Sequence, residues 1–367
     1  MPLSSLDERF MSVALRFSCW GTGLTGTNPS VACLIVKDGI IVGRGVTAYG
    51  GRPHAETQAL EEAGERARGA TAYVTLEPCS HYGQAPPCAK FIVEAGISRV
   101  VVCVVDPDVR VSGRGLQWLS QKGIIVDKVL EREGERVLGA YLTRQVKNRS
   151  YVILKLALSQ DNMIGIVGCG NVSITGLISR KQVHLLRAQS DAILVGIGTV
   201  ISDNPELTCR LDGLKDRSPI RIILDPHLKI SLSSRIMQTA SLAPVIIVTE
   251  KNDFDLALSI KKNNVDIVHC NCRDLKKLLA ILADRGITSL LVEGGARVAR
   301  SFMMSGFVDS IILYKSQKII GTSGIASPLE EEFIENNFMC VRRDGFGSDV
   351  CFEYVRKNFC LQESLRI

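Results

Sequence analysis

The chain has 367 residues, of which 46% are hydrophobic and 22% are charged. These proportions are ordinary for a folded globular protein and exclude a largely disordered chain, while the length favours two domains over one. The net charge of +6 is spread along the sequence, which favours a small anionic substrate and gives little support for nucleic acid. No apolar run approaches the roughly 18 residues of a membrane-spanning helix.

Twelve cysteines are scattered between Cys19 and Cys360, without the short spacings of a disulfide framework. In a chain of this size, dispersed cysteines are typical of a reducing compartment. Near the start, Asp7 and Glu8 precede an amphipathic apolar set, which predicts a surface helix rather than a signal peptide. We therefore expect a cytoplasmic protein with a small-molecule partner and without a membrane or nucleic-acid partner; a homo-oligomer is left open.

Apolar runs of strand length alternate with helical patterns through the first 145 residues, which predicts an α/β layer structure. Two runs flank the turn 37–39 and predict a hairpin. The expected strands are 31–36, 40–46, 71–76, 98–105 and 124–129. Helices are expected over 54–67, 88–95 and, as one polar helix, 131–146.

The basic stretch KNRS (147–150) ends this series, and a second α/β series follows it. We expect one domain over residues 1–147 and another over 148–367. Expected strands of the second domain are 151–159, 191–196, 219–225, 243–249, 265–270 and 289–295, with helices over 179–189 and 297–304. The last two strands, 338–343 and 349–355, are joined by a Gly-rich turn and predict an antiparallel hairpin.

The segments PHAE (53–56) and TLEPCSHYGQAPPC (75–88) together predict a zinc site. A catalytic zinc ion needs three protein ligands and an open position, and His54, Cys79 and Cys88 supply three. Glu56, two residues beyond His54, is then free to move protons, as in zinc deaminases with an H-x-E and P-C pattern. His54 and Cys88 also open predicted helices, whose N-termini favour a thiolate ligand.

Other interpretations of the cysteines stay open from the residues alone. Cys79 and Cys88 could be small buried hydrophobic residues, or they could belong to a structural zinc site. A structural site requires a fourth ligand, for which His81 is the nearby candidate, and it leaves Glu56 without a role.

With these motifs in view, the sequence resembles the bifunctional riboflavin-biosynthesis deaminase/reductase family. The first half resembles its deaminase part through TNPSVACLIVKDG (27–39), PHAE and TLEPCSHYGQAPPC. The second half resembles its reductase part through LKLALSQD (154–161), LLRAQSDAILVGIGTV (185–200), DNPELTCR (203–210) and LLVEGGA (290–296). The resemblance implies a cytidine-deaminase-like three-layer αβα domain followed by a dihydrofolate-reductase-like α/β domain.

For the first half, the resemblance implies zinc-dependent deamination of 2,5-diamino-6-(5-phosphoribosylamino)pyrimidin-4(3H)-one, with Glu56 as the acid/base residue. It also implies that Asn28 and His81 contact this phosphorylated pyrimidine. From the residues alone, Asn28 before Pro29 is equally typical of a turn.

For the second half, the resemblance implies NADPH-dependent reduction of the ribosyl group to a ribityl chain. The implied substrate-binding residues are Lys155, Asn171, Arg187, Leu207, Arg210 and Glu293. The implied cofactor-binding residues are Ala157, Ser173, Thr199, Asp203, Gly295, Ala296, Arg297 and Val298. A guanidinium group matches phosphate oxygens, so Arg187 and Arg210 are expected near the substrate phosphate. Lys229 and Lys251 are candidates for the coenzyme 2′-phosphate because both follow predicted strands.

Some positions depart from the family pattern. Thr47, Gln84 and Ala32 stand where many members have His, a basic residue and Gly, and Asn162, Ser173 and Asn204 replace Gly, Trp and Asp. Two rival functions are a deaminase of another pyrimidine or of a nucleic-acid base with a degenerate second half, and a binding module with structural zinc. The 5% content of aromatic residues argues against nucleic-acid binding, which uses aromatic side chains for stacking.

Overall fold

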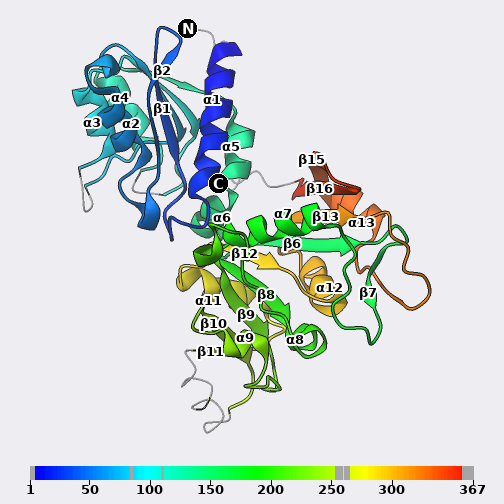
Figure 1. The fold of residues 1–367 in the computed structure, drawn as a ribbon. Coiled ribbons are helices and arrows are strands. Elements are labelled where there is room, and N and C mark those ends of the chain that lie inside the picture. Colours follow the sequence, from blue (N-terminus) through cyan, green and yellow to red (C-terminus); the bar gives the residue numbers. More distant parts are fainter. Residues whose placement is uncertain (1–4, 83–85, 109–110, 253–258, 260–264, 358–367) are drawn as a thin grey trace. The chain divides into compact units, whose positions relative to one another are not determined.

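The computed structural model describes residues 5–82, 86–108, 111–252, 259 and 265–357 (Figure 1). The chain divides into two compact units, one that runs to Asn148 and one that begins at Arg149. Across the described ranges, we find no helix with the length and apolar character needed to cross a membrane.

The first unit is built on a five-stranded sheet with the order β2-β1-β3-β4-β5. Its strands are β1 (Ala32–Lys37), β2 (Ile40–Val46), β3 (Thr71–Leu76), β4 (Arg99–Val104) and β5 (Ile125–Lys128). β1 is antiparallel to both neighbours, whereas β3, β4 and β5 are parallel. The continuous apolar runs of β1, β3 and β4 are buried, as expected for strands covered on both faces.

Helices cover both faces of this sheet and give the expected three layers. They are α1 (Ser5–Ser18), α2 (Ala55–Ala63), α3 (Cys88–Glu94), α4 (Arg114–Gln121), α5 (Glu131–Val137) and α6 (Gly139–Lys147). α1 and α5 pack on one face, and α2, α3 and α4 lie on the other (Figure 1). The single helix expected over 131–146 is wrong: the backbone leaves helical geometry at Leu138, and Gly139, a poor helix former, begins α6.

Two glycines of β2 set the position of α2. A Cβ atom on Gly43 would lie 2.1 Å from the Ala59 carbonyl oxygen, and one on Gly45 would lie 2.1 Å from that of Ala55. Because neither glycine has a side chain, the helix lies directly on the strand. The start of α2, and with it His54, is held against the sheet.

The second unit is built on a nine-stranded sheet with the order β11-β10-β9-β8-β12-β6-β13-β16-β15. Its strands are β6 (Tyr151–Leu158), β8 (Ala192–Gly196), β9 (Ile220–Leu224), β10 (Val245–Thr249), β11 (Val265–His269), β12 (Ser289–Val292), β13 (Val308–Lys315), β15 (Phe338–Phe346) and β16 (Asp349–Arg356). The strands from β11 to β13 are parallel, and the β15–β16 hairpin is added antiparallel at one edge. This arrangement confirms the expected terminal hairpin.

Helices and a small ribbon complete the second unit. The described helices are α7 (Leu177–Ala188), α8 (Ile197–Asp203), α9 (Arg235–Gln238), α11 (Leu275–Asp284), α12 (Ala296–Met304) and α13 (Glu331–Asn337). β7 (Met163–Ile166) and β14 (Gly324–Ala326) pair as a separate antiparallel ribbon.

Alternation along β6 decides which side chains face the core. Val152, Leu154 and Leu156 are packed in the cluster that includes residues of α11 and α12. Ile153 and Ala157 lie on the opposite face, against a cluster that includes Val183 of α7. Successive strand residues point to opposite faces, so Lys155 shares the face of α7.

Candidate active sites

In the first unit, His54, Cys79 and Cys88 come together where β3 ends and two helices begin. His54 immediately precedes α2, Cys79 follows β3 by three residues, and Cys88 is the first residue of α3. His54 Nδ1 lies 3.7 Å from Cys79 Sγ and 3.3 Å from Cys88 Sγ. Zinc bonds of about 2.0–2.3 Å in tetrahedral geometry place ligand atoms roughly 3.5 Å apart, so the three side chains fit a zinc ion.

Among the described residues, these three form the one group of His, Cys and acidic side chains whose ligand atoms all lie within 4.8 Å of one another. His81, the fourth ligand that a structural site requires, is not in the group. The arrangement therefore supports three protein ligands and an open position, as catalytic zinc sites have.

The surroundings stabilise a thiolate at Cys79. A hydrogen bond from the Cys88 side chain and a further one from His54 lower the pKa of Cys79 to about 4, although burial opposes this shift. The backbone N–H of Cys88 also donates to Cys79 Sγ at 3.2 Å. The interaction with Cys79 and burial hold the pKa of Cys88 well above its usual range. The Cys88 side chain and backbone amide therefore favour the thiolate form of Cys79, the form that ligates zinc.

Glu56 lies beside this group without belonging to it. Its side chain is 3% exposed. Burial, with the Cys79 thiolate adding to it, raises the pKa of Glu56 to about 7. A carboxyl group with a pKa near neutrality exchanges protons readily at physiological pH, which is the property that a general acid/base requires.

Asn28 and His81 have polar atoms available for a ligand. His81 Nδ1 is buried and has no hydrogen-bond partner within the described part of the chain. Thr25 and Asn28 exchange hydrogen bonds that involve the Asn28 backbone, at 2.7 and 3.2 Å, which is the turn expected from the residues alone. The Asn28 amide packs against Gly51, where a Cβ atom would lie 2.1 Å from its Nδ2.

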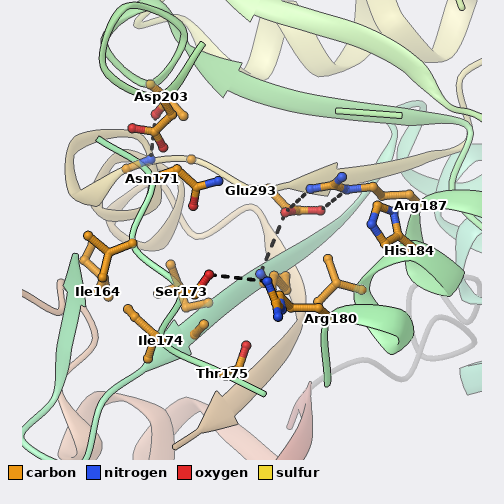
Figure 2. Close-up of a pocket in the computed structure, with 18 of the residues that line it drawn as sticks. Ile164, Asn171, Ser173, Ile174, Thr175, Arg180, His184, Arg187, Asp203 and Glu293 are labelled. Atoms are coloured by element: carbon orange, nitrogen blue, oxygen red, sulfur yellow. Dashed lines mark hydrogen bonds and ion pairs between the residues drawn. The ribbon is translucent and has the colours of Figure 1, made fainter. Parts of the chain in front are cut away.

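In the second unit, a cavity of about 340 Å³ opens beside β6, α7 and the turn after β12 (Figure 2). Ten of the residues expected at this site line it: Lys155, Ala157, Asn171, Ser173, Arg187, Thr199, Asp203, Arg210, Glu293 and Gly295. Leu207 is instead buried in a hydrophobic cluster, and Ala296, Arg297 and Val298 in the first turn of α12 do not line the cavity.

Glu293 is the electrostatic centre of this cavity. Its two carboxylate oxygens accept from Arg187 Nε at 2.9 Å and Nη2 at 3.0 Å, and Lys155 Nζ lies 3.7 Å from Oε2 (Figure 2). Burial favours the neutral acid, but Arg187 and Lys155 outweigh it and lower the pKa of Glu293 to about 2. Burial lowers the pKa of Lys155, an effect that Glu293 opposes.

Two further basic side chains of the cavity were missed from the sequence, as was Thr175. Arg180 and His184 line it together with Arg187, all from α7 (Figure 2). Burial and the two neighbouring arginines, Arg187 and Arg210, lower the pKa of His184, which keeps its ring neutral at physiological pH. The spacing i, i+4, i+7 places the three α7 residues on one helix face and is the signal that could have found them.

The turn after β12 has the features of an anion site for the cofactor. Gly295 N donates to Thr199 Oγ1 at 3.3 Å and precedes the first residue of α12. A Cβ atom on Gly294 would lie 2.8 Å from that of Val298, so this turn requires glycine. Gly294 and Gly295 line the cavity, and glycines at a helix N-terminus allow an anionic group such as a cofactor phosphate to approach the backbone. Lys229 and Lys251 do not line the cavity.

The departures from the family pattern have local explanations in the structure. Asn162 and Asn204 adopt the left-handed region at φ 60° and 43°, which Asn tolerates better than most residues. Ser173 Oγ accepts from Arg180 Nη1 at 3.3 Å. Thr47 Oγ1 accepts from Val31 N at 2.9 Å, beside the paired ends of β1 and β2. Gln84 lies outside the described residues.

Comparison with known proteins decides the family. The family model for the RibD C-terminal domain matches residues 150–352, and that for the cytidine and deoxycytidylate deaminase zinc-binding region matches residues 4–104. The riboflavin biosynthesis protein RibD of Aquifex aeolicus is 38% identical over 357 residues, covering 96% of this chain and 99% of the relative. The chain belongs to the RibD family. RibD of Escherichia coli is also 38% identical, over 95% of this chain and 99% of its own.

Solved RibD structures have the same fold over nearly the whole chain. RibD of Acinetobacter baumannii superposes with a TM-score of 0.84 at 32% identity, covering 96% of this chain and 99% of its own. The RibD-type deaminase/reductase of Thermotoga maritima gives a TM-score of 0.84 at 34% identity with the same coverage. As a RibD protein, the chain is a riboflavin-biosynthesis enzyme with a zinc-dependent deaminase and an NADPH-dependent reductase. The rival interpretation of a structural-zinc binding module is not favoured.

Proposed function

We propose that the first unit deaminates a phosphoribosylaminopyrimidine and that the second unit reduces its ribosyl group. These substrates are the ones named for the Thermotoga maritima relative, a diaminohydroxyphosphoribosylaminopyrimidine deaminase and 5-amino-6-(5-phosphoribosylamino)uracil reductase. The observation that carries the deaminase assignment is the His54, Cys79 and Cys88 group beside a buried Glu56.

In the deaminase site we assign zinc ligation to His54, Cys79 and Cys88. A zinc ion in such a site lowers the pKa of bound water to roughly 7 and so supplies a nucleophile at neutral pH. Glu56 takes up one proton from water and delivers a proton to the departing ammonia, because its pKa lies near neutrality. Asn28 and His81 hold the pyrimidine, since the amide of Asn28 and the unpartnered Nδ1 of His81 face no competing hydrogen bond within the described residues.

In the reductase site we assign the sugar to Lys155 and Glu293. Glu293 remains ionised and accepts hydrogen bonds from the ribose hydroxyls. Lys155, made more acidic by burial, donates a proton to the ring oxygen as the sugar opens. NADPH supplies the hydride for the sugar carbon when it is bound. Asn171, which lines the cavity, completes the substrate site that we propose, whereas the buried Leu207 is left out of it.

The cavity wall is suited to anionic ligands. Four cationic side chains line it, and Glu293 occupies two of them, Lys155 and Arg187. Arg210 is 52% exposed at its side chain and lies 3.6 Å from Glu206, so its guanidinium can reach a phosphate. We assign the substrate phosphate to Arg210 and to the two N–H groups of Arg187 that Glu293 and Thr208 leave unused. We assign the cofactor to Ala157, Ser173, Thr199, Asp203 and Gly295, all of which line the cavity.

We further propose that the enzyme works in the cytoplasm on small molecules and not on nucleic acid. All eleven described cysteines are free. A reducing compartment keeps such thiols reduced and, with them, the zinc ligands competent.

The test is to follow ammonia release and NADPH oxidation separately with the phosphoribosylaminopyrimidine. The native enzyme should release ammonia without NADPH and should oxidise NADPH only after deamination. Glu56→Gln should lose ammonia release by roughly 10²-fold or more, the usual scale for a general acid/base. The same variant should keep its zinc and should reduce the deaminated substrate at the native rate. Near-native ammonia release from Glu56→Gln would remove Glu56 from the mechanism.

A further inference from the structure

Glu77 is a buried acidic residue to which neither proposed activity gives a role. It follows β3 directly and stands two residues before Cys79, with Pro78 between them. Its side chain is 3% exposed. No cationic side chain pairs with it among the described residues, so backbone groups alone neutralise its charge in the described part of the unit.

Both carboxylate oxygens of Glu77 accept from backbone amides of one segment, between the end of β4 and the first turn of α4. Oε1 accepts from Gly115 N at 3.0 Å and Leu116 N at 3.3 Å. Oε2 accepts from Gly113 N at 2.9 Å and Asp106 N at 3.3 Å. Amides at a helix N-terminus lack intrahelical partners and carry partial positive charge, so they stabilise an anionic acceptor.

The start of α4 also contacts the residue that precedes the zinc ligand. A Cβ atom on Gly115 would lie 2.5 Å from the Pro78 carbonyl oxygen and 3.1 Å from Glu77 Oε1. The segment is anchored at its other end by Asp106, whose carboxylate accepts from Tyr141 Oη at 2.9 and 3.1 Å. Glu77 therefore connects the Pro78–Cys79 segment to the start of α4 and to Asp106, which Tyr141 holds.

We propose that Glu77 is a positioning residue for zinc, which holds Cys79 at the distance from His54 and Cys88 that the metal requires. The inference rests on the ligand set assigned under the proposed function. Groups that orient metal ligands typically change metal affinity 10–100-fold when they are removed.

Glu77→Gln tests the role with little change in side-chain volume. Each carboxylate oxygen accepts from two N–H groups, so an amide NH₂ in either place faces two donors and loses two hydrogen bonds. We expect zinc release to a colorimetric chelator to be at least 10-fold faster than in the native enzyme. Trp20 and Trp118 both lie in the first unit, so their fluorescence in the same sample gives the fraction of that unit that is folded. Reductase activity should be unchanged and normalises the amount of enzyme.

Asp7→Asn is the matched control for lost stability. Like Glu77, Asp7 is a carboxylate of the first unit with a 3% exposed side chain. Its partners include Arg99 and Tyr73, which lie outside the Pro78–Cys79 segment. Asp7→Asn should lower the thermal midpoint of this unit and leave the rate of zinc release unchanged. If both variants release zinc equally fast, or if Glu77→Gln keeps native release, Glu77 does not position the site.

Two further variants keep the outcome unambiguous. Gly115→Ala, which pushes α4 against the Pro78 carbonyl, should also speed zinc release and serves if Glu77→Gln does not fold. Cys88→Ser should lose zinc altogether. Zinc loss in Cys88→Ser with native release in Glu77→Gln overturns only the positioning role, whereas full zinc in Cys88→Ser overturns the ligand set.

Discussion

Glu293 forms ion pairs with Lys155 and Arg187, although burial of its side chain disfavours the ionised form. Arg187 uses two N–H groups on Glu293 and a third on the Thr208 carbonyl at 3.2 Å. Lys155 approaches from the neighbouring strand because β12 and β6 pair in parallel with Val292 opposite Leu154, which leaves Glu293 and Lys155 next in register. Removing one partner from such a group leaves the others buried without compensation.

We therefore expect Glu293→Gln to destabilise the reductase unit by roughly 3 kcal/mol at pH 7. The pKa of Glu293 is about 2 in the folded state against an ordinary value of 4.5. A depressed pKa stabilises the fold above the ordinary value, and this contribution is lost as pH falls from about 4.5 toward 2. As pH falls from about 4.5 toward 2, the free energy of unfolding should therefore decrease less in Glu293→Gln than in the native enzyme.

Urea unfolding at several pH values measures the stability of the second unit, and the unfolding of the first unit serves as the internal control. The two tryptophans, Trp20 and Trp118, both lie in the first unit. Their fluorescence transition should be the same in Glu293→Gln and in the native enzyme, while circular dichroism reports the weakened second unit. Parallel pH profiles for the two proteins would show that Glu293 does not carry the acid sensitivity.

Site residues that form a recognisable sequence motif could be predicted, whereas hydrogen-bond partners far apart in the chain could not. His54, Cys79 and Cys88 could be singled out because ligand types in an H-x-E and P-C pattern are informative by themselves. Glu77 had no such signal, since its amide partners lie 29 to 39 residues further along the chain. Arg180 and His184 had a signal in their helical spacing with Arg187, but only a known cavity gives that face a meaning.

The loop between β2 and α2 contains a matched pair of glycines. Gly50 and Gly51 both have positive φ, at 72° and 91°. A Cβ atom on Gly50 would meet nothing within 4 Å, whereas one on Gly51 would lie 2.1 Å from Asn28 Nδ2. Alanine strains the backbone at either position, but only at Gly51 does it also displace the side chain that we assign to the pyrimidine.

Gly51→Ala should therefore lower deaminase kcat/KM by at least 10-fold, the cost of about 1.4 kcal/mol in transition-state binding. Gly50→Ala should cost only stability and stay within about 2-fold of native activity, since its strain does not reach the site. The two variants are compared by steady-state ammonia release. Zinc content is measured in both as a control for loss of the metal. Equal losses in the two variants would mean that backbone strain, and not Asn28, accounts for the effect.

Many strands were predicted within about two residues, as for β2 and β3, which match the expected ranges 40–46 and 71–76. The helix expected over 54–67 and the strand expected over 289–295 were predicted too long, since α2 ends at Ala63 and β12 at Val292. The strand expected over 338–343 was predicted too short, since β15 continues to Phe346. The pattern over 131–146 hid a break, because Leu138 is apolar and suits a helix although its backbone departs from one. β13 was not predicted as a strand, although it is an interior strand of the sheet, paired with β6 on one side and β16 on the other. Sheet order depends on pairing between distant segments, which local patterns do not encode.

The two units should be separable. The two largest hydrophobic clusters of the second unit consist entirely of its own residues, from Val152 to Phe338. A fragment of residues 148–367 should fold and should oxidise NADPH when it is given the deaminated substrate. Circular dichroism and NADPH absorbance check the two parts of this prediction. A folded but inert fragment would show that the reductase depends on the first unit.

Arg149 provides a control on that fragment. Its guanidinium binds Asp309 through Nη1 at 2.6 Å and Nη2 at 2.7 Å, and Asp309 is 1% exposed. Arg149→Ala in the fragment leaves this carboxylate buried without its cation and should destabilise it by roughly 3 kcal/mol. A fragment that begins at residue 150 also lacks Arg149 and should be destabilised for the same reason.

Asp349, at the start of β16, accepts from Gly176 N at 2.7 Å and from Ser179 Oγ at 2.6 Å. These donors belong to the beginning of α7, the helix that contributes Arg180, His184 and Arg187 to the cavity. During translation, the described residues of the deaminase unit have all been made once Asn148 is added, whereas the start of α7 gains its partner Asp349 only about 200 residues later. At 5–20 residues per second this interval lasts roughly 10–40 s. A nascent chain thus has the three zinc ligands that we propose well before it has a finished reductase cavity.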